Sequence, residues 1–128
     1  MARTKTSRTL IGAGTVVVSA GAQRAAIDLN NTDGGFLTVK MVNGSVAPTA
    51  PCVCNIHVSH SVSLPATGPA GIAWKTVTSI LGPAAADGIV ESGWLVDQSI
   101  MCLQVEFRGA TGQSTTVEAS LSELTSAI

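Results

Sequence analysis

The sequence predicts an all-β protein: a small antiparallel β-sandwich, jelly-roll-like or Greek-key, with about eight strands and an extended N-terminal arm. Two observations predict it. Apolar and polar residues alternate with a period of two in several segments, as in strands with one buried face. Clusters of Gly, Pro, Asn and Asp separate these segments at intervals typical of sandwiches and barrels. No amphipathic helix of useful length is expected, and a closed barrel is the alternative architecture.

Each strand is expected from its own stretch of sequence. In MCLQVEFR, for example, Met101, Leu103, Val105 and Phe107 share one face and the intervening residues share the other. The expected segments are, in chain order, TVVV from residue 15, AIDL from 26, FLTVKM from 36, CVCNIHVS from 52, GIAWKTVTSIL from 71, SGWLVDQSI from 92, MCLQVEFR from 101 and TTVEASL from 115. Turn-forming residues separate them at 30–35, 43–44, 64–69, 82–88 and 109–113.

The composition limits the class of protein. The 128 residues are enough for one domain with its own core, expected over residues 13–128 behind an arm of residues 1–12. Only 12% of the residues are charged, against about a quarter in a typical soluble domain. A surface rich in Ser, Thr and Gly but poor in charge suits a protein whose surface is largely covered by other subunits.

Arg3, Lys5 and Arg8 form the basic cluster of the predicted arm. From Thr9 onward the chain carries four basic residues against eight acidic ones, so direct contact with nucleic acid is not expected. The arm is instead expected to contact a neighbouring protein subunit. The apolar stretch behind it is interrupted by glycine and hydroxyl residues, so no signal peptide is expected. No apolar run approaches the roughly 20 residues of a membrane-spanning helix.

Soft metal ligands crowd together in one stretch, PCVCNIHVSH at residues 51–60. In a strand, alternation sends Cys52 and Cys54 to one face and His57 to the other. One regular strand cannot bring four ligands within about 2.0–2.3 Å of a single ion, so no metal site is expected. The three cysteines, Cys102 included, are predicted to be buried packing residues, with a bridge between Cys54 and Cys102 left open.

The sequence contains no arrangement that predicts catalysis. Ser59 and His60 are neighbours in a strand and point to opposite faces, and no GxSxG elbow occurs. Glu106 and Glu118 are expected on the polar faces of adjacent strands, as cross-strand neighbours, with Arg108 as a natural pairing partner. We interpret them as a surface pair rather than as catalytic carboxylates. No catalytic residue and no cofactor is therefore predicted.

Three residues are candidates for a subunit interface. His57 lies on the polar face of its strand and could meet its copies on a threefold axis. Trp74 and Trp94 each lie on a predicted strand beside a glycine, where core packing is the default. Because Trp is enriched at interfaces, one of the two is also a candidate for a subunit contact.

Three stretches resemble small virion proteins of tailed bacteriophages in strand style and composition: WKTV from residue 74, MCLQVEFRG from 101 and TVEASLSELTS from 116. The resemblance covers roughly residues 26–128. It implies a non-enzymatic decoration or cement protein on the capsid, often a trimer, that clasps its neighbours with terminal arms. It carries over no individual site residues.

The sequence thus predicts a structural subunit of a virion that is assembled in the host cytoplasm. The predicted partners are further copies of the chain, with a trimer favoured, and the major capsid protein or other virion subunits. Contact with a membrane is not expected. A head-neck or tail subunit and a carbohydrate-binding β-sandwich module are the alternatives, and a small hydrolase or metal enzyme is a further rival.

Overall fold

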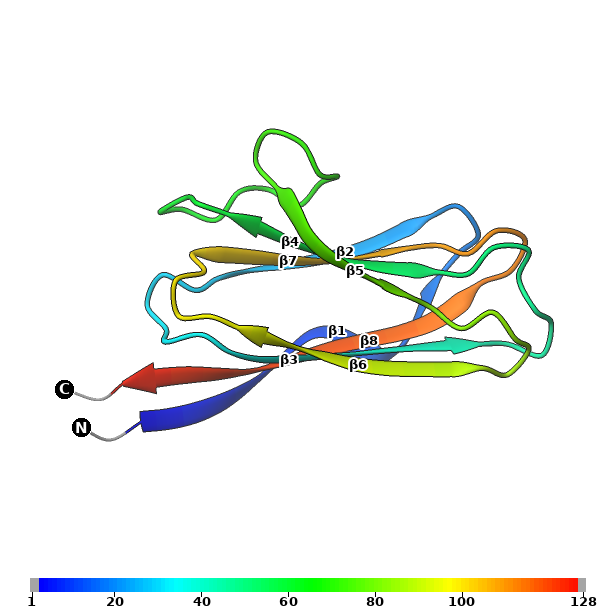
Figure 1. The fold of residues 1–128 in the computed structure, drawn as a ribbon, viewed down its shortest axis with the longest axis horizontal. Coiled ribbons are helices and arrows are strands. Elements are labelled where there is room, and N and C mark those ends of the chain that lie inside the picture. The colour runs from blue at the N-terminus through cyan, green and yellow to red at the C-terminus, as the bar shows by residue number, and fades with distance from the viewer. Residues whose placement is uncertain (1–2, 127–128) are drawn as a thin grey trace.

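The computed structural model describes residues 3–126, which form eight β-strands in two stacked layers (Figure 1). The strands are β1 (Arg3–Val17), β2 (Ala22–Asp28), β3 (Gly35–Asn43), β4 (Val53–Ser59), β5 (Lys75–Leu81), β6 (Ile89–Val96), β7 (Cys102–Arg108) and β8 (Thr115–Ser126). The predicted all-β sandwich is confirmed. Among these residues no helix is long and apolar enough to cross a membrane. The outermost residues of the predicted arm and domain, 1–2 and 127–128, lie outside the described residues.

The strand order shows how the chain winds. One sheet, sheet A, has the order β1-β8-β3-β6, and the other, sheet B, has the order β2-β7-β4-β5. The pairs β1·β8, β2·β7, β3·β6 and β4·β5 are all antiparallel. The chain therefore runs as one long hairpin, with β1–β4 against β5–β8, wrapped over two layers. This is the winding of a jelly roll, and because the sheets stay separate the closed-barrel alternative is wrong.

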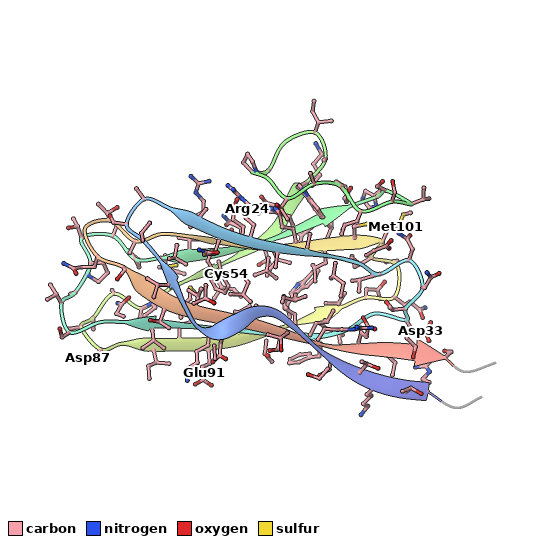
Figure 2. The ribbon with its side chains drawn as sticks, turned by 180° about the vertical axis from the view of Figure 1, so that it is seen from behind. Arg24, Asp33, Cys54, Asp87, Glu91 and Met101 are labelled. Carbon is pink, nitrogen blue, oxygen red and sulfur yellow. The ribbon has the colours of Figure 1, made fainter. Side chains whose placement is uncertain are left out.

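The core lies between the two sheets and uses the inward side of each alternation. Cys54, for example, lies between the layers in Figure 2. The inward residues of β3, β4, β7 and β8 are Leu37, Val39, Met41, Cys54, Ile56, Val58, Leu103, Val105, Phe107, Val117, Ala119 and Leu121. Burying an aliphatic or aromatic side chain of this size contributes about 1.5–3 kcal/mol. Aliphatic packing of this kind holds the two sheets together.

β7 and β8 follow one another in the sequence but lie in different sheets. Glu106 is therefore on the outer face of sheet B, where it is opposite Asn55, and Glu118 is on the outer face of sheet A, opposite Lys40. The expectation that the two glutamates are cross-strand neighbours is wrong. Alternation determines the face of a strand on which a residue lies, but it does not determine which sheet the strand joins.

β1 is the longest strand and includes residues 3–12 of the predicted arm. Its first part pairs with residues 120–126 of β8. The register then shifts on both sides of Ile11, and the chain bulges before it rejoins β8 at Thr15. Gly14 in this bulge has a φ of 84°, a conformation that glycine adopts without steric cost.

Candidate interaction surface

The outer face of sheet B is covered by the segment that joins β4 to β5. Residues 60–74, here called the cover loop, stand above the upper layer in Figure 1. Beneath them β7 is buried on both faces from Cys102 to Phe107. Trp74 at the end of the loop is 1% exposed, and its Nε1 donates to the Ala66 carbonyl at 2.8 Å. The cover loop therefore creates a second, smaller buried region outside the main core.

Gln104 of β7 anchors the cover loop to sheet B. Its Oε1 accepts a hydrogen bond from the Gly68 N–H at 3.0 Å, and its Nε2 donates to the Gly68 carbonyl at 2.7 Å. These two bonds fix the orientation of the amide. The second hydrogen on Nε2 is then available to His57 Nδ1, which is 2.7 Å away. His57 must accept at Nδ1 and carry its hydrogen on Nε2, which is the neutral form.

His57 Nε2 is buried and has no hydrogen-bond partner among the described residues. It lies 3.9 Å from Glu106 Oε1. Burial lowers the pKa of His57, the negative charge of Glu106 partly opposes this shift, and the positive charge of Arg24 adds to it. The imidazole is therefore neutral at pH 7, in agreement with the hydrogen-bond pattern.

Glu106 is 2% exposed and joins three elements of sheet B. Its Oε2 accepts from Arg24 Nε of β2 at 2.6 Å, and its Oε1 accepts from Asn55 Nδ2 of β4 at 3.0 Å. Arg108 lies farther away, at 4.0 Å. Burial alone would raise the pKa of this carboxyl, but the hydrogen bonds from Asn55 and Arg24 and the charge of Arg24 hold the pKa below its usual value. Glu106 is therefore a buried, paired carboxylate.

The candidate interface residues from the sequence lie in different places. His57 and Trp74 are each 1% exposed, so neither side chain reaches the surface of the chain. Trp94 points inward from β6 and is half-buried at the margin of the core. The structure does not bring the three together, and their part in a subunit contact stays a prediction.

The three basic residues of the predicted arm are all exposed on β1. Arg3 and Lys5 lie on the outer side of sheet A, and Lys5 lines a hollow there. Arg8 has the opposite parity, and its Nη2 donates to Glu123 Oε1 of the same chain at 3.0 Å. Their binding to a neighbouring subunit stays a prediction.

The cysteines and histidines are separated as the alternation predicts. Cys52 and Cys54 are buried in the core, while His57 lies on the other side of sheet B, and all three cysteines are free. Burial raises the pKa of Cys52 to about 11 and that of Cys54 to about 12, so both thiols are protonated at neutral pH. Within residues 3–126 no three His, Cys, Asp or Glu side chains form a group that could hold a metal ion.

The outer face of sheet A carries shallow hollows where sheet B carries the cover loop, and the two larger ones adjoin. The larger, of about 530 Å³, lies along the middle of the face; it is lined by Phe36, Thr38, Val39, Lys40, Glu91, Ser92, Gly93, Glu118 and Ser120. The smaller, of about 360 Å³, lies at the end near the chain termini; it is lined by Lys5, Asp33, Gly35, Phe36, Leu95, Val96, Ser122 and Leu124. Phe36 borders both. Its ring lies over Gly93, where a Cβ would come within 2.4 Å of the ring.

Large apolar side chains are exposed around this face. Phe36 and Leu95 are cross-strand partners of β3 and β6 and are 47% and 73% exposed, and Ile89 at the start of β6 is 57% exposed. In Figure 2, Glu91 extends from the same outer side of sheet A, while Arg24 lies on the outer side of sheet B. Uncovered apolar side chains beside a polar hollow are typical of a surface that binds a partner.

Sequence reasoning missed the cover loop and its anchor Gln104. One signal was available, because residues 60–74 separate two strands by more than the 2–5 residues of an ordinary hairpin. The burial of Gln104 and Glu106 had no such signal, since both are polar residues on the polar side of β7. The alternation of β6 places Ile89 and Leu95 on the same side of the strand, but it does not show that this side is left uncovered.

Comparison with known proteins identifies the fold. No protein-family model matches the chain, and no curated protein matches it. The K3 cleaved adhesin domain of Lys-gingipain from Porphyromonas gingivalis W83 is similar with a TM-score of 0.54 and 11% identity, over 96% of this chain and 74% of that one.

Two further solved structures are similar. A chain of the T13 IBDV viral particle has a TM-score of 0.53 and 12% identity, over 96% of this chain and 31% of that one. Dimeric latent PorU from Porphyromonas gingivalis has a TM-score of 0.51 and 7% identity, over 96% of this chain and 13% of that one. At these identities the likeness shows the fold alone, and one fold hosts many functions.

Proposed function

We propose that this chain is a non-enzymatic structural subunit of a virion, which stabilises the capsid lattice through contacts with neighbouring subunits. The observation that carries the proposal is the uncovered outer face of sheet A. There Phe36, Ile89 and Leu95 are 47%, 57% and 73% exposed, in a chain of which only 12% of residues are charged. Other large apolar side chains, such as Val62 and Ile72 of the cover loop, are also exposed. Those of sheet A stand on a regular sheet face, and apolar side chains exposed on such a face favour association with another protein.

The shape and chemistry of this face suit a protein partner. Its two hollows meet at Phe36 and are lined by residues of β1, β3, β6 and β8, so together they extend over the whole width of the sheet. Phe36 and Leu95 lie beside Lys5 and Asp33 at one hollow, and Phe36 borders Lys40 and Glu91 at the other, so apolar and charged side chains stand side by side. An apolar patch bordered by polar groups is the usual layout of a protein–protein interface.

The fold and the arm agree with this proposal. The sequence resembles virion proteins of tailed phages, and the fold is similar to that of a chain of the T13 IBDV viral particle. Both similarities are to components of virions. Arg3 and Lys5 stand at the margin of the same face, where an acidic patch of a neighbouring subunit would contact them. The proposed partner is the major capsid protein or another virion subunit of the head, neck or tail.

A carbohydrate-binding module receives less support. Such a module presents several exposed aromatic rings, and the chain has four aromatic residues. Trp74 and Phe107 are buried and Trp94 is half-buried, so Phe36 is the one aromatic ring that is largely exposed. A single ring does not form a sugar-binding platform.

The test begins with purified particles of the virus that encodes the chain. Quantitative mass spectrometry should find the chain in many copies per particle, and particles assembled without it should take up the purified protein. The double variant Phe36→Ser with Leu95→Ser should lose this binding. Val77→Ser with Leu81→Ser, which changes two side chains of β5 that are 47% and 65% exposed, should keep it.

The two parts of the test contradict different statements. Absence of the chain from the particles would overturn the proposed function. Equal binding by both double variants would overturn the assignment of the outer face of sheet A as the contact surface.

A further inference from the structure

The four edge strands of the sandwich differ in how they are protected against pairing. β1 and β6 are the edges of sheet A, and β2 and β5 are the edges of sheet B. An edge strand presents unpaired backbone groups, which proteins shield with bulges, charges or neighbouring segments. β1 has two register shifts and the basic side chains of the arm, and β5 has a register shift and Lys75. β2 carries Arg24 and Asp28 and contacts β1.

β6 is the unprotected edge. It pairs with β3 in unbroken register and contains no Pro, Lys or Arg, and its one charged residue is Glu91. On its outer side Ile89 and Leu95 are 57% and 73% exposed. On its inner side Val90 and Trp94 are half-buried at the margin of the core. A regular, largely uncharged edge with apolar side chains on both sides is a template for another strand.

We propose that β6 pairs with β6 of a second copy of this chain, antiparallel and across a twofold axis at Ser92, so that the two copies of sheet A form one continuous sheet. This inference goes beyond the proposed function. It names a second copy as a partner, and it holds whether or not the chain belongs to a virion. Since Ile89 and Leu95 would be covered in the pair, Phe36 and the hollows beside it are what such a pair leaves for the proposed virion contact.

The side chains select the register. In an antiparallel pair of β6 strands, opposite residues lie on the same side of the sheet, so the twofold axis must pass through a residue. With the axis at Ser92, Ile89 of one copy lies opposite Leu95 of the other on the outer side, and this contact occurs twice. On the inner side Val90 lies opposite Trp94. Apolar side chains that are exposed in one copy thus cover one another in the pair.

The charges select the same register. With the axis at Ser92, Glu91 lies opposite Gly93, so the two carboxylates do not face each other. An axis at Glu91 would place the two carboxylates directly opposite, which is destabilising. An axis at Gly93 would place Glu91 opposite Leu95. Of these neighbouring registers, the axis at Ser92 alone matches apolar with apolar and separates the charges.

The inference gives Trp94 a role. In one copy this side chain is left half-buried on β6, the edge strand, and in the pair it would be covered by Val90 of the second copy. Trp94 would then be the member of the predicted interface set that contacts another subunit. The contact would be twofold, whereas the sequence favoured a trimer.

The experiment measures the mass of the complete chain in solution by sedimentation equilibrium. The wild type should have twice the 12.9 kDa of one chain at micromolar concentration. The double variant Ile89→Lys with Leu95→Lys should raise the dissociation constant about tenfold or more, because lysines face each other twice. Ile89→Glu with Leu95→Lys should restore the dimer, because a glutamate then faces a lysine. The two positions lie about 20 Å apart within one strand, so the difference cannot arise inside one copy.

Controls keep the outcome decisive. Val77→Lys with Leu81→Lys on β5 should leave the mass unchanged, and circular dichroism should show each variant folded. Under oxidising conditions, Ser92→Cys should form a disulfide between the two copies, because residue 92 of one copy faces residue 92 of the other. Glu91→Cys should not form one. If a lysine variant fails to fold, this comparison of the two cysteine variants tests the inference instead. Three results would overturn the inference. The wild type could stay monomeric at 0.1 mM, roughly the concentration that detects a weak dimer. It could form a trimer, or the two double variants could have equal dissociation constants.

Discussion

The outer faces of the two sheets are built in opposite ways. On sheet B His57, Gln104 and Glu106 are buried, with Gln104 bonded to the cover loop, and the chain satisfies most of their polar groups itself. On sheet A the equivalent face keeps Phe36 and Lys40 open to solvent around two hollows. Both faces come from strands with the same alternation, so the difference lies in the cover loop rather than in the strands.

The comparison separates residues that stabilise the fold from residues that are available for binding. A buried polar group that is paired contributes little to the free energy of unfolding. A substitution that removes it and leaves its buried partner unpaired lowers that free energy substantially. An exposed apolar side chain contributes little to the fold in either case. Substitutions on the covered face should therefore change the free energy of unfolding, and substitutions on the open face should change association.

The largest effect is expected at Trp74, the main apolar residue of the covered face. Trp74→Ala should lower the free energy of unfolding by about 3–5 kcal/mol, because it removes a fully buried ring and the support of the cover loop. The control on the open face, Phe36→Ala, should cost about 1 kcal/mol or less, since that ring is 47% exposed. Urea unfolding measures both. Similar decreases in the free energy of unfolding for the two variants would show that the two faces contribute equally to stability.

The next effect is expected at the ion pair between Arg24 and Glu106. Arg24→Met leaves a carboxylate that is 2% exposed without its closest cation, and should lower the free energy of unfolding by about 3 kcal/mol. Arg8→Met removes the corresponding ion pair with Glu123, but the Arg8 side chain is 54% exposed, so its loss should be about 0–1 kcal/mol. Denaturant midpoints for the two variants test the difference, which an equal loss would contradict.

The fold was predictable from the sequence to the level of strands and their inward faces. Alternation placed Cys54 in the core and His57 on the opposite side, because the side-chain period of a strand is fixed by its geometry. The strand order could not be predicted in this way. Glu106 and Glu118 were expected to be neighbours because their strands adjoin in the sequence, yet β7 and β8 belong to different sheets.

The candidate site was predictable only in part. The sequence identified the low charge and the basic residues of the arm. Whether the polar face of a strand is buried, as it is at Gln104, depends instead on where a loop distant in the sequence folds. Exposure of Ile89 and Leu95 likewise depends on β6 being an edge strand, which is a property of the sheet order. Local sequence patterns carry no information on either point.

A pH effect of intermediate size is expected from His57. Its pKa is lowered in the folded protein, so the unfolded chain binds a proton more readily, starting near its ordinary pKa of about 6.5. The free energy of unfolding should therefore be constant above about pH 7.5 and fall progressively as the pH drops below about 6.5. Protonation of His57 at Nδ1 would also replace the acceptor of the Gln104 Nε2 hydrogen bond by a second donor. The two donors would repel each other, and the cover loop, which Gln104 anchors, would loosen.

One variant isolates this effect. His57→Gln should flatten the dependence between pH 7 and 5.5, because it removes the group whose pKa is lowered by folding. Glu106 also has a lowered pKa, but its contribution is lost only on approach to the ordinary range of carboxyl groups, near pH 4. A slope above pH 5.5 that persists in His57→Gln would assign the effect to another group.

The smallest effect is expected at Glu91, a glutamate of the open face that pairs with Lys40. It lies 3.7 Å from Lys40 Nζ, with side chains 68% and 38% exposed. Glu91→Gln should change the free energy of unfolding by about 0.5 kcal/mol or less, and this change should vanish in high salt, because water and ions screen an exposed pair. Glu106→Gln makes the same chemical change on the covered face and should cost several times more. If Glu91→Gln proved as costly, the outer face of sheet A would be coupled to the fold as tightly as that of sheet B, and it could no longer be regarded as a surface free for a partner.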